Sequence, residues 1–421
     1  MSGSVQRTVL DNGVRIVTET LEDLRSASIG FWVDVGSRDE GAEQQGICHF
    51  IEHMMFKGTD TLSARDIAER IDAVGGQLNA FTTKEQTCFY ARVLDQHLDR
   101  AVALLADMLL HSRMDPADVE KEKGVILEEI RMYEDTPDEL IHDLVAEAAL
   151  GRHPAGRSVL GTEQSVRAFL PEQVREFVRT YYTGQRLVVA AAGRLDHERL
   201  VDQVARLFGG LPPGDRPRRS SPVESEFRWL VRGKKTEQAH LCVSSPGLEA
   251  GSPHKWPLMV LDTVLGGGVS SRLFQQLREE RGWVYSTYSY HTALADTGYF
   301  TVYAGASPDK ATSVLELIEQ ELASVAGSGI REDELRRAKE HLKGSLMLSL
   351  ESTSHRMSRL ARCELTGEAY LPADEVLARI EAVTVEQVHR LAASMFLPDR
   401  YAYAAVGPVH WKTQRRLAAA G

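Results

Sequence analysis

The residues best suited to chemistry lie in the segment GICHFIEHMMFKG, which contains the pattern His49-x-x-Glu52-His53. Apolar residues recur here with the spacing of one helical stripe, at Ile47, Phe50, Ile51, Met54 and Met55. On a helix, the two histidines would stand one turn apart and share the opposite face with Glu52. Two imidazoles at this spacing can bind one divalent ion.

The chemistry that this pattern predicts is that of a zinc hydrolase. Imidazole nitrogens suit zinc, and a catalytic zinc site keeps one position open for water. Glu52 would act as the general base and take the proton of the metal-activated water. The alternative is a solvated polar helix face, which would be the better interpretation for a single histidine. The same ligands would also accept manganese or cobalt.

A catalytic zinc ion needs a third protein ligand, and the segment ADVEKEKGVILEEIRMYED offers several carboxylates on a predicted helix over residues 116–134. Glu122 and Glu129 are two helical turns apart and lie on nearly the same face, whereas Glu128 points elsewhere. This geometry favours Glu129 as the ligand and Glu122 as a group that orients or charges the site. Spacing alone does not choose between the two, and an ordinary solvated acidic helix is the alternative.

The elements that must hold these residues form two similar halves. The segments Glu172-Gln173-Val174 and Glu386-Gln387-Val388 lie in predicted helices, and each leads into a short apolar strand at the same offset. A looser match relates residues 66–93 to residues 273–305. Similarity at a fixed offset indicates duplication of one α+β unit.

The predicted domains are residues 1–212 and 227–421, joined by a linker at 213–226 that is rich in Gly, Pro, Arg and Ser. Strands are predicted at 13–17, 28–35, 86–93, 187–192, 239–245, 299–305 and 401–406. Helices are predicted at 45–57, 65–75, 97–111, 116–134, 138–150, 197–207, 256–265, 270–281, 309–326, 332–350 and 385–395. Each half mixes a sheet with helices and lacks strict βαβ alternation, so the expected class is α+β.

Composition excludes several classes of protein. The chain has 421 residues, of which 43% are hydrophobic and 26% charged, as expected for two globular domains. No apolar run approaches the roughly 20 residues that span a bilayer, and the first residues do not resemble a secretory signal. A net charge of −11 argues against nucleic acid as the main partner. Four scattered cysteines indicate reduced thiols in a cytoplasmic protein.

Several segments of the sequence resemble those of a known protein family. The pattern His49-x-x-Glu52-His53 resembles the inverted zinc motif of the pitrilysin and insulinase-type peptidases. The stretch HFIEHMMFKGT is similar to the active subunit of mitochondrial processing peptidase and its bacterial relatives. The likeness continues through GGQLNAFTTKEQTCFYARV and GGGVSSRLFQQLREERGWVYS, and covers nearly the whole chain. It implies one zinc ion per chain, with Glu129 as third ligand and Glu122 as the acidic residue that accompanies it.

The resemblance also implies the fold and further site residues. Two homologous domains, each a mostly antiparallel sheet packed with helices, would face each other across a cleft. A substrate would add as a strand to the sheet edge at Asn79, Ala80 and Phe81. Arg278 and Tyr285 of the second domain would reach the substrate or stabilise the tetrahedral intermediate.

The function implied is that of a zinc-dependent endopeptidase that cuts peptides or unfolded, presequence-like segments. Relatives of this length form half of a four-domain chamber, so a homodimer is expected, with a heterodimer containing an inactive homologue as the alternative. A scaffold protein without catalysis and a zinc hydrolase acting on other substrates are the two remaining hypotheses. The presence of both histidines and both glutamates argues against a scaffold.

Overall fold

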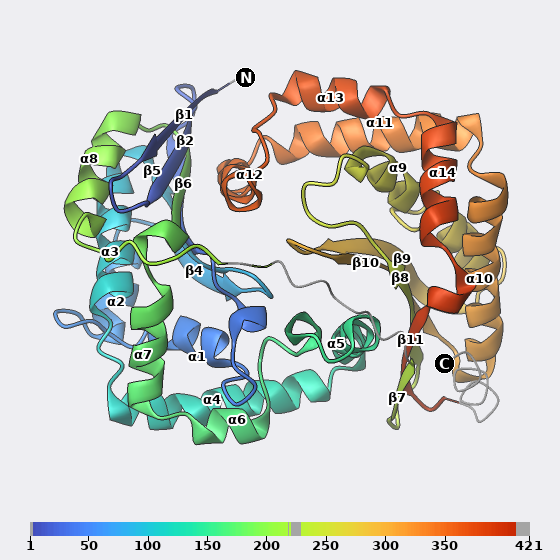
Figure 1. Ribbon diagram of the computed structural model, residues 1–421, viewed down its shortest axis with the longest axis horizontal. Helices are drawn as coiled ribbons and strands as arrows, with labels where there is room; N and C mark the ends of the chain where they lie inside the picture. Colours follow the sequence, from blue (N-terminus) through green and yellow to red (C-terminus); the bar gives the residue numbers. More distant parts are fainter. Residues whose placement is uncertain (1–2, 218, 220–228, 410–421) are drawn as a thin grey trace. The chain divides into compact units, whose positions relative to one another are not determined.

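The computed structural model describes residues 3–217, 219 and 229–409 of the chain (Figure 1). The chain divides into two compact units, and each unit is built on one β-sheet. The first unit comprises Met1–Ile130, Ser158–Arg218 and Leu348–Leu371, and the second comprises Arg131–Arg157, Arg219–Met347 and Pro372–Gly421. Both units combine a sheet with helices, which confirms the predicted α+β class.

The first unit contains a six-stranded sheet in the order β1-β2-β6-β3-β5-β4. Its strands are β1 Ser4–Val9, β2 Arg15–Thr20, β3 Ser26–Val33, β4 Gln77–Thr82, β5 Thr87–Leu94 and β6 Leu187–Gly193. Neighbouring strands are antiparallel except for β2 and β6. The central strands β3 and β6 are buried almost throughout, whereas β4 forms an edge whose residues are exposed or half-buried. An edge strand keeps main-chain groups that another strand can pair with.

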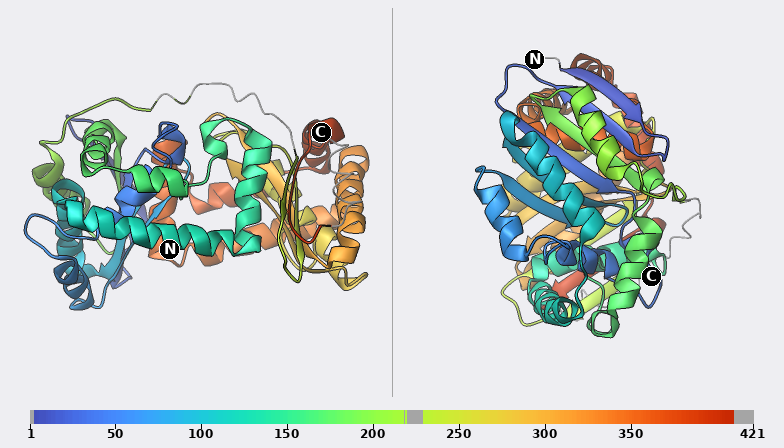
Figure 2. Two further views of the ribbon diagram at one scale, coloured as in Figure 1. Left: turned by 90° about the horizontal axis from the view of Figure 1, so that it is seen from below. Right: turned by 90° about the vertical axis from the view of Figure 1, so that its left-hand side faces the viewer.

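Helices of the first half of the chain cover one face of this sheet. They are α1 Ile47–Met54, α2 Ala64–Asp72, α3 Leu98–His111, α4 Pro116–Glu134, α6 Glu163–Ala168, α7 Pro171–Tyr181 and α8 His197–Phe208. The largest buried cluster of the unit joins Phe31 and Phe89 of the sheet to Phe50 of α1 and Phe208 of α8. Figure 2 shows α4, drawn in teal, as one continuous helix of 19 residues.

The second unit contains a five-stranded sheet in the order β7-β11-β8-β10-β9. Its strands are β7 Trp229–Gly233, β8 Ala239–Pro246, β9 Val284–Ala293, β10 Gly298–Ala306 and β11 Ala402–Gly407, and only β7 and β11 are parallel. Its helical elements are α9 Lys255–Leu265, a π-helical segment Phe274–Glu279, α10 Ala311–Ser328, α11 Glu332–Ser349, α13 Ala373–Glu381 and α14 Val385–Met395.

Each sheet is covered on its other face by one helix from the opposite half of the chain. Helix α12 Thr353–Thr366 lies beside the first sheet (Figure 1). Its residues Met357 and Leu360 pack against Trp32 and Val188 of that sheet. Helix α5 Pro137–Leu150 packs against β8 and β11 of the second sheet, through residues such as Ile141. The compact units therefore exchange helices, and they differ in this from the contiguous domains 1–212 and 227–421 that the sequence predicts.

The duplication predicted from the sequence is visible in the elements. Helix α7 leads into β6 as α14 leads into β11, and all seven predicted strands are present. The predictions miss β1, β4, β7 and β9, which are exposed or half-buried at many positions, and the helices α6, α12 and α13. The helix predicted at 270–281 contains the π-helical segment Phe274–Glu279. Within the predicted linker, residues 218 and 220–226 lie outside the described part of the chain.

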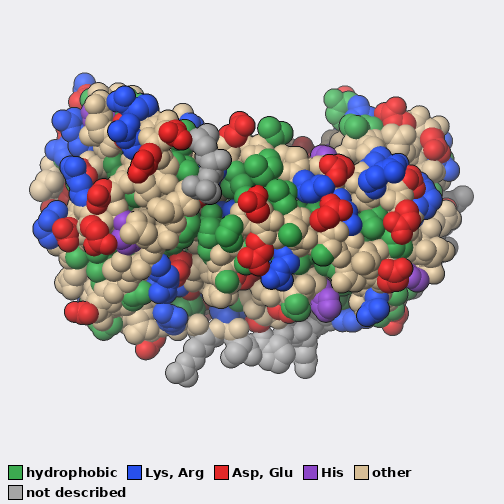
Figure 3. Space-filling view, turned by 90° about the horizontal axis from the view of Figure 1, so that it is seen from above, with side chains coloured by type: hydrophobic (Ala, Val, Ile, Leu, Met, Phe, Trp, Pro, Cys, Tyr) green, Lys and Arg blue, Asp and Glu red, His purple; other side chains and the backbone are tan. Residues whose placement is uncertain are grey.

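Charged side chains of both signs lie on the surface of the described part of the chain. Among the described residues on the face shown in Figure 3, acidic and basic side chains are interspersed rather than gathered into one basic patch. None of the described helices combines the length and the apolar composition that crossing a membrane requires.

Candidate metal centre

The helix α1 carries the His49-x-x-Glu52-His53 pattern and is fixed at its beginning by a buried carboxylate. Glu40 accepts hydrogen bonds from the main-chain N–H of Gly46 at 2.7 Å and of Cys48 at 2.9 Å. Gly46 has a φ of 88°, a left-handed conformation that glycine adopts without strain. The apolar stripe of α1 is buried, so the opposite face presents the two histidines and Glu52.

The carboxylate of the donor set, that of Glu129, comes from α4. One oxygen of Glu129 lies 3.7 Å from Nε2 of His49, and the other lies 3.6 Å from Nε2 of His53. One donor atom from each of these three residues lies within 4.8 Å of the other two, and the described residues contain no second group of this kind. Ligand atoms around a tetrahedral zinc ion stand about 3.4 Å apart, given metal–ligand distances of about 2.0–2.2 Å. The donor set therefore fits zinc.

The protonation of His49 suits metal binding. Burial, with a smaller contribution from the neighbouring charge of His53, lowers the pKa of His49 to about 4. The imidazole of His49 is thus neutral at physiological pH, and a neutral imidazole is the form that binds a metal ion.

A hydrogen-bonded chain stands behind His53. Glu122, which is 1% exposed, lies 2.8 Å from Nδ1 of His53 through Oε1 and 2.6 Å from Nζ of Lys57 through Oε2. Burial alone would raise the pKa of Glu122, but the hydrogen bond with His53 and the ion pair with Lys57 outweigh it and lower this pKa. Glu122 therefore stays ionised and orients the ring of His53. Sequence reasoning did not find Lys57, because a single lysine four residues after His53 resembles any helix-end lysine.

Glu52 is held by a residue from the edge strand β4. The hydroxyl of Thr82 donates a hydrogen bond of 2.6 Å to Oε2 of Glu52. Burial raises the pKa of Glu52, and the bond from Thr82 opposes this rise. No motif spacing connects Thr82 with Glu52, which lies 30 positions away in the chain.

Asn79, Ala80 and Phe81 lie on the open edge of the first sheet. The main-chain N–H of Thr83 bonds to the carbonyl of Gln86 at 2.7 Å, which sets the alternation of the antiparallel pair β4–β5. By this alternation the main-chain groups of Ala80 and Thr82 point away from β5, toward the free edge. The N–H of Ala80 is met by the side chain of Asn79 at 2.8 Å.

Arg278 and Tyr285 belong to the second unit. The guanidinium of Arg278 lies 4.9 Å from the ring centre of Phe274 and 5.6 Å from that of Tyr285. The side chain of Tyr285 is 73% exposed. The structure brings this pair together, and their action on a substrate at the metal centre stays a prediction.

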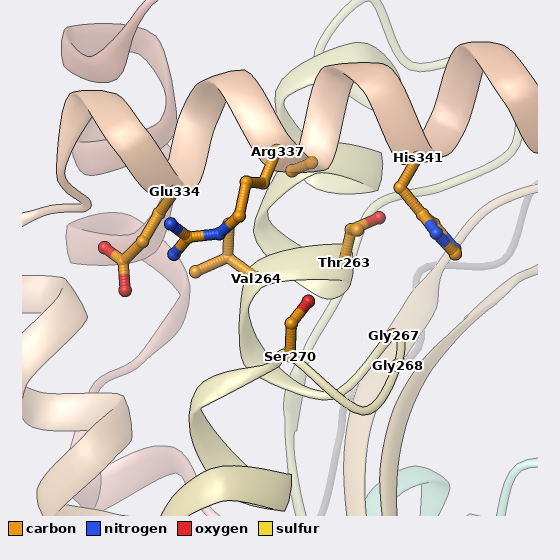
Figure 4. Close-up of a pocket in the computed structure, with 9 residues that line it drawn as sticks. Thr263, Val264, Gly267, Gly268, Ser270, Glu334, Arg337 and His341 are labelled. Carbon is orange, nitrogen blue, oxygen red and sulfur yellow. The ribbon is translucent and has the colours of Figure 1, made fainter.

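One pocket of the second unit is too small to bind a peptide substrate. It lies between the glycine segment that follows α9, with Gly267 and Gly268, and the residues Arg337 and His341 of α11 (Figure 4). Its volume of about 40 Å³ holds a water molecule or two but no peptide.

The chain is similar in sequence to known peptidases. Residues 15–163 match the family model "Insulinase (Peptidase family M16)" and residues 169–342 match "Peptidase M16 inactive domain". The chain is 45% identical over 404 residues to an uncharacterized zinc protease of Bacillus subtilis, covering 96% of this chain and 98% of that protein. It is 48% identical over 414 residues to an uncharacterized zinc protease of Mycobacterium leprae, covering 97% and 92%.

More distant proteins match nearly the whole length of the chain. A probable mitochondrial-processing peptidase subunit beta of Arabidopsis thaliana is 34% identical over 418 residues, covering 96% of this chain and 78% of that protein. A peptidase M16 inactive domain from Pseudomonas fluorescens superimposes with a TM-score of 0.90 at 20% identity, covering 97% of this chain and 99% of the other. A protease from Helicobacter pylori gives 0.89 at 20% identity, covering 96% and 99%. These two likenesses concern the fold, whereas the matches in sequence show that the chain belongs to peptidase family M16, the insulinase family.

Proposed function

We propose that this protein is a zinc-dependent endopeptidase with a single zinc ion held by His49, His53 and Glu129. The observation that carries the proposal is the convergence of their three donor atoms beside the carboxylate of Glu52. The names of the bacterial relatives, which are zinc proteases, support the same assignment. One ion per chain is proposed because the described residues contain one such group.

In the mechanism, zinc would supply a Lewis acid that polarises a water molecule and the substrate carbonyl. Glu52 would accept a proton from the attacking water at its carboxylate and later deliver it to the nitrogen of the leaving amine. Its hydrogen bond to Thr82 occupies Oε2, so Oε1 is the oxygen available for this transfer. Glu122 and Lys57 would hold the ring of His53 in place while the proton moves.

The substrate is proposed to be an extended peptide or an unfolded, presequence-like segment. At the open edge of β4, the main-chain groups of Ala80 and Thr82 point away from β5, and the hydroxyl of Thr82 holds Glu52. An extended chain can pair there as an additional strand, whereas a folded domain cannot. Asn79, Ala80 and Phe81 are accordingly proposed as substrate-binding residues. Arg278 and Tyr285 would assist by stabilising the oxyanion.

We further propose that two copies of the chain associate as a homodimer in the cytoplasm. The resemblance to enzymes with four such domains supports association, and a heterodimer with an inactive homologue is the alternative. The four cysteines are all free thiols, which fits a reducing compartment.

The decisive experiment combines metal dependence with specificity. A peptide library would be incubated with the protein, with the chelator-treated protein and with that protein after zinc is restored, and the products would be identified by mass spectrometry. Cleavage that chelation abolishes and zinc restores is the expected result. Cleavage that persists without metal would overturn the proposal, as would a fully loaded protein that cuts nothing.

A further inference from the structure

The hydroxyl of Thr82 has a single and specific partner. It donates a hydrogen bond of 2.6 Å to Oε2 of Glu52, which is short, as expected when the acceptor carries a charge. The described residues offer no other hydrogen bond to the side chain of Glu52. The orientation of this carboxylate therefore depends on Thr82.

Thr82 itself sits in a well-anchored position. It is the last residue of β4, and Thr83 follows it in the turn to β5. The N–H of Thr83 bonds to the carbonyl of Gln86 at 2.7 Å, and the carbonyl of Thr83 accepts from the N–H of Ser37 at 3.1 Å. The turn is thus tied both to β5 and to the loop after β3. A donor fixed in this way can hold a carboxylate in one orientation.

The main-chain groups of Thr82 point in a different direction from its side chain. Thr83 and Gln86 form a hydrogen-bonded pair, so Thr82 and Thr87 form the next pair, whose main-chain groups do not bond to each other. The N–H and carbonyl of Thr82 consequently point to the free edge of the sheet, while its side chain reaches Glu52. Thr82 thus connects two features of the site. Its main chain lies at the edge where a further strand can pair, and its side chain holds the carboxylate of Glu52.

We propose that Thr82 is a positioning residue, whose hydroxyl holds the general base Glu52 and whose main chain links pairing of the substrate strand to the orientation of that base. This inference rests on the proposed function, because it assumes that Glu52 acts as the base. It adds that the edge strand has a second role besides binding. A substrate strand that pairs with Thr82 would fix the donor that holds Glu52.

The test compares two substitutions in the full-length, zinc-loaded protein. Thr82→Val removes the hydroxyl and keeps the shape, whereas Thr82→Ser keeps the hydroxyl and loses the methyl group. We expect Thr82→Val to lower kcat about tenfold or more with KM changed less than about twofold. Thr82→Ser should retain kcat near that of the wild type, and both variants should bind one equivalent of zinc. Thr82→Ala replaces the valine variant if that protein does not fold.

A binding measurement separates positioning from direct contact with the substrate. Glu52→Gln and the double variant Glu52→Gln/Thr82→Val would be titrated with a fluorescent extended peptide, and equal Kd values are expected. A wild-type kcat in Thr82→Val, an equal loss in Thr82→Ser, or weaker binding by the double variant would each overturn the proposal. Cleavage by the wild type that survives chelation would instead contradict the zinc mechanism, so the two failures are distinguishable.

Discussion

The imidazole of His53 lies between two carboxylates, with Nδ1 2.8 Å from Glu122 and Nε2 3.6 Å from Glu129. Because Glu122 is ionised, Nδ1 carries the proton and donates it to this hydrogen bond. The lone pair of Nε2 then points toward Glu129, which is the arrangement that a metal ligand requires. The ion pair of Glu122 with Lys57 at 2.6 Å keeps the buried carboxylate charged.

This relationship predicts that Glu122→Gln weakens zinc binding without removing a ligand. The substitution keeps the shape of the side chain and removes the charge that orients His53. We expect the zinc dissociation constant to rise roughly 10- to 100-fold. Competition with a chromophoric chelator measures this constant. Glu128→Gln, an exposed neighbour on the same helix, is the matched control and should bind zinc as the wild type does. Equal affinities of the two variants would refute the role of Glu122.

A second prediction concerns Glu52, which lies on the same helix as His49 and His53. Glu52→Gln should keep one equivalent of zinc and lower kcat by roughly 10²- to 10⁴-fold, the contribution of a general base. Metal content by mass spectrometry and steady-state cleavage of a peptide provide the two readouts. If the variant cleaved the peptide at the rate of the wild type, Glu52 would have no place in the mechanism.

The sequence predicts one part of the site well and the other part poorly. His49, Glu52 and His53 lie on a single helix, so their spacing alone determines that they share a face. Glu122 and Glu129 also share a face of one helix. Helical spacing does not determine which of them lies near Nε2 of His53. That choice depends on how α4 packs against α1.

Contacts between residues far apart in the sequence cannot be predicted from residue spacing. Thr82 reaches Glu52 because β4 forms the sheet edge next to α1, and this follows only from the three-dimensional arrangement. The exchange of α5 and α12 escapes prediction for a similar reason. An apolar stripe shows that a helix buries one face, and it does not show which sheet that face covers.

A third prediction tests the support of α1 by Glu40. Glu40→Ala removes the acceptor of two main-chain N–H groups at the beginning of the helix that carries both histidines. Because each charge-assisted bond contributes about 1.5–3 kcal/mol, the loss of both should lower the free energy of unfolding by about 3–6 kcal/mol. Urea unfolding followed by circular dichroism measures the change. Glu43→Ala, in the exposed part of the same loop, should alter it by less than about 0.5 kcal/mol, and similar losses in both variants would contradict the assignment.

Arg278 provides the prediction that connects the second unit to catalysis. Arg278→Ala should leave zinc content unchanged and lower kcat by about a hundredfold, the effect of removing one oxyanion donor. Arg281→Ala is the control, since Arg281 also stacks on an aromatic ring, that of Trp283 at 5.4 Å. A wild-type kcat in Arg278→Ala, measured with saturating peptide, would show that this arginine has only a structural role.

The last prediction concerns a buried carboxyl in the second unit, Asp262 of α9, which accepts a hydrogen bond from Ser289. Burial raises the pKa of Asp262 to about 6, above its ordinary value of 3.8. The folded protein therefore holds this proton more tightly than the unfolded chain does. The stabilisation that results is complete below pH 3.8 and is lost as the pH rises through about 6.

Asp262→Asn removes this titration and keeps an acceptor for Ser289. At pH 7 the variant should be more stable than the wild type by about 3 kcal/mol at most, since one unit of pKa corresponds to about 1.4 kcal/mol. The difference should shrink toward zero near pH 4. Urea unfolding of both proteins at several pH values between these limits measures it, with Asp309→Asn as the control at an exposed carboxylate. A gap that stays constant over this range would mean that Asp262 does not titrate there, and that the gain has another cause.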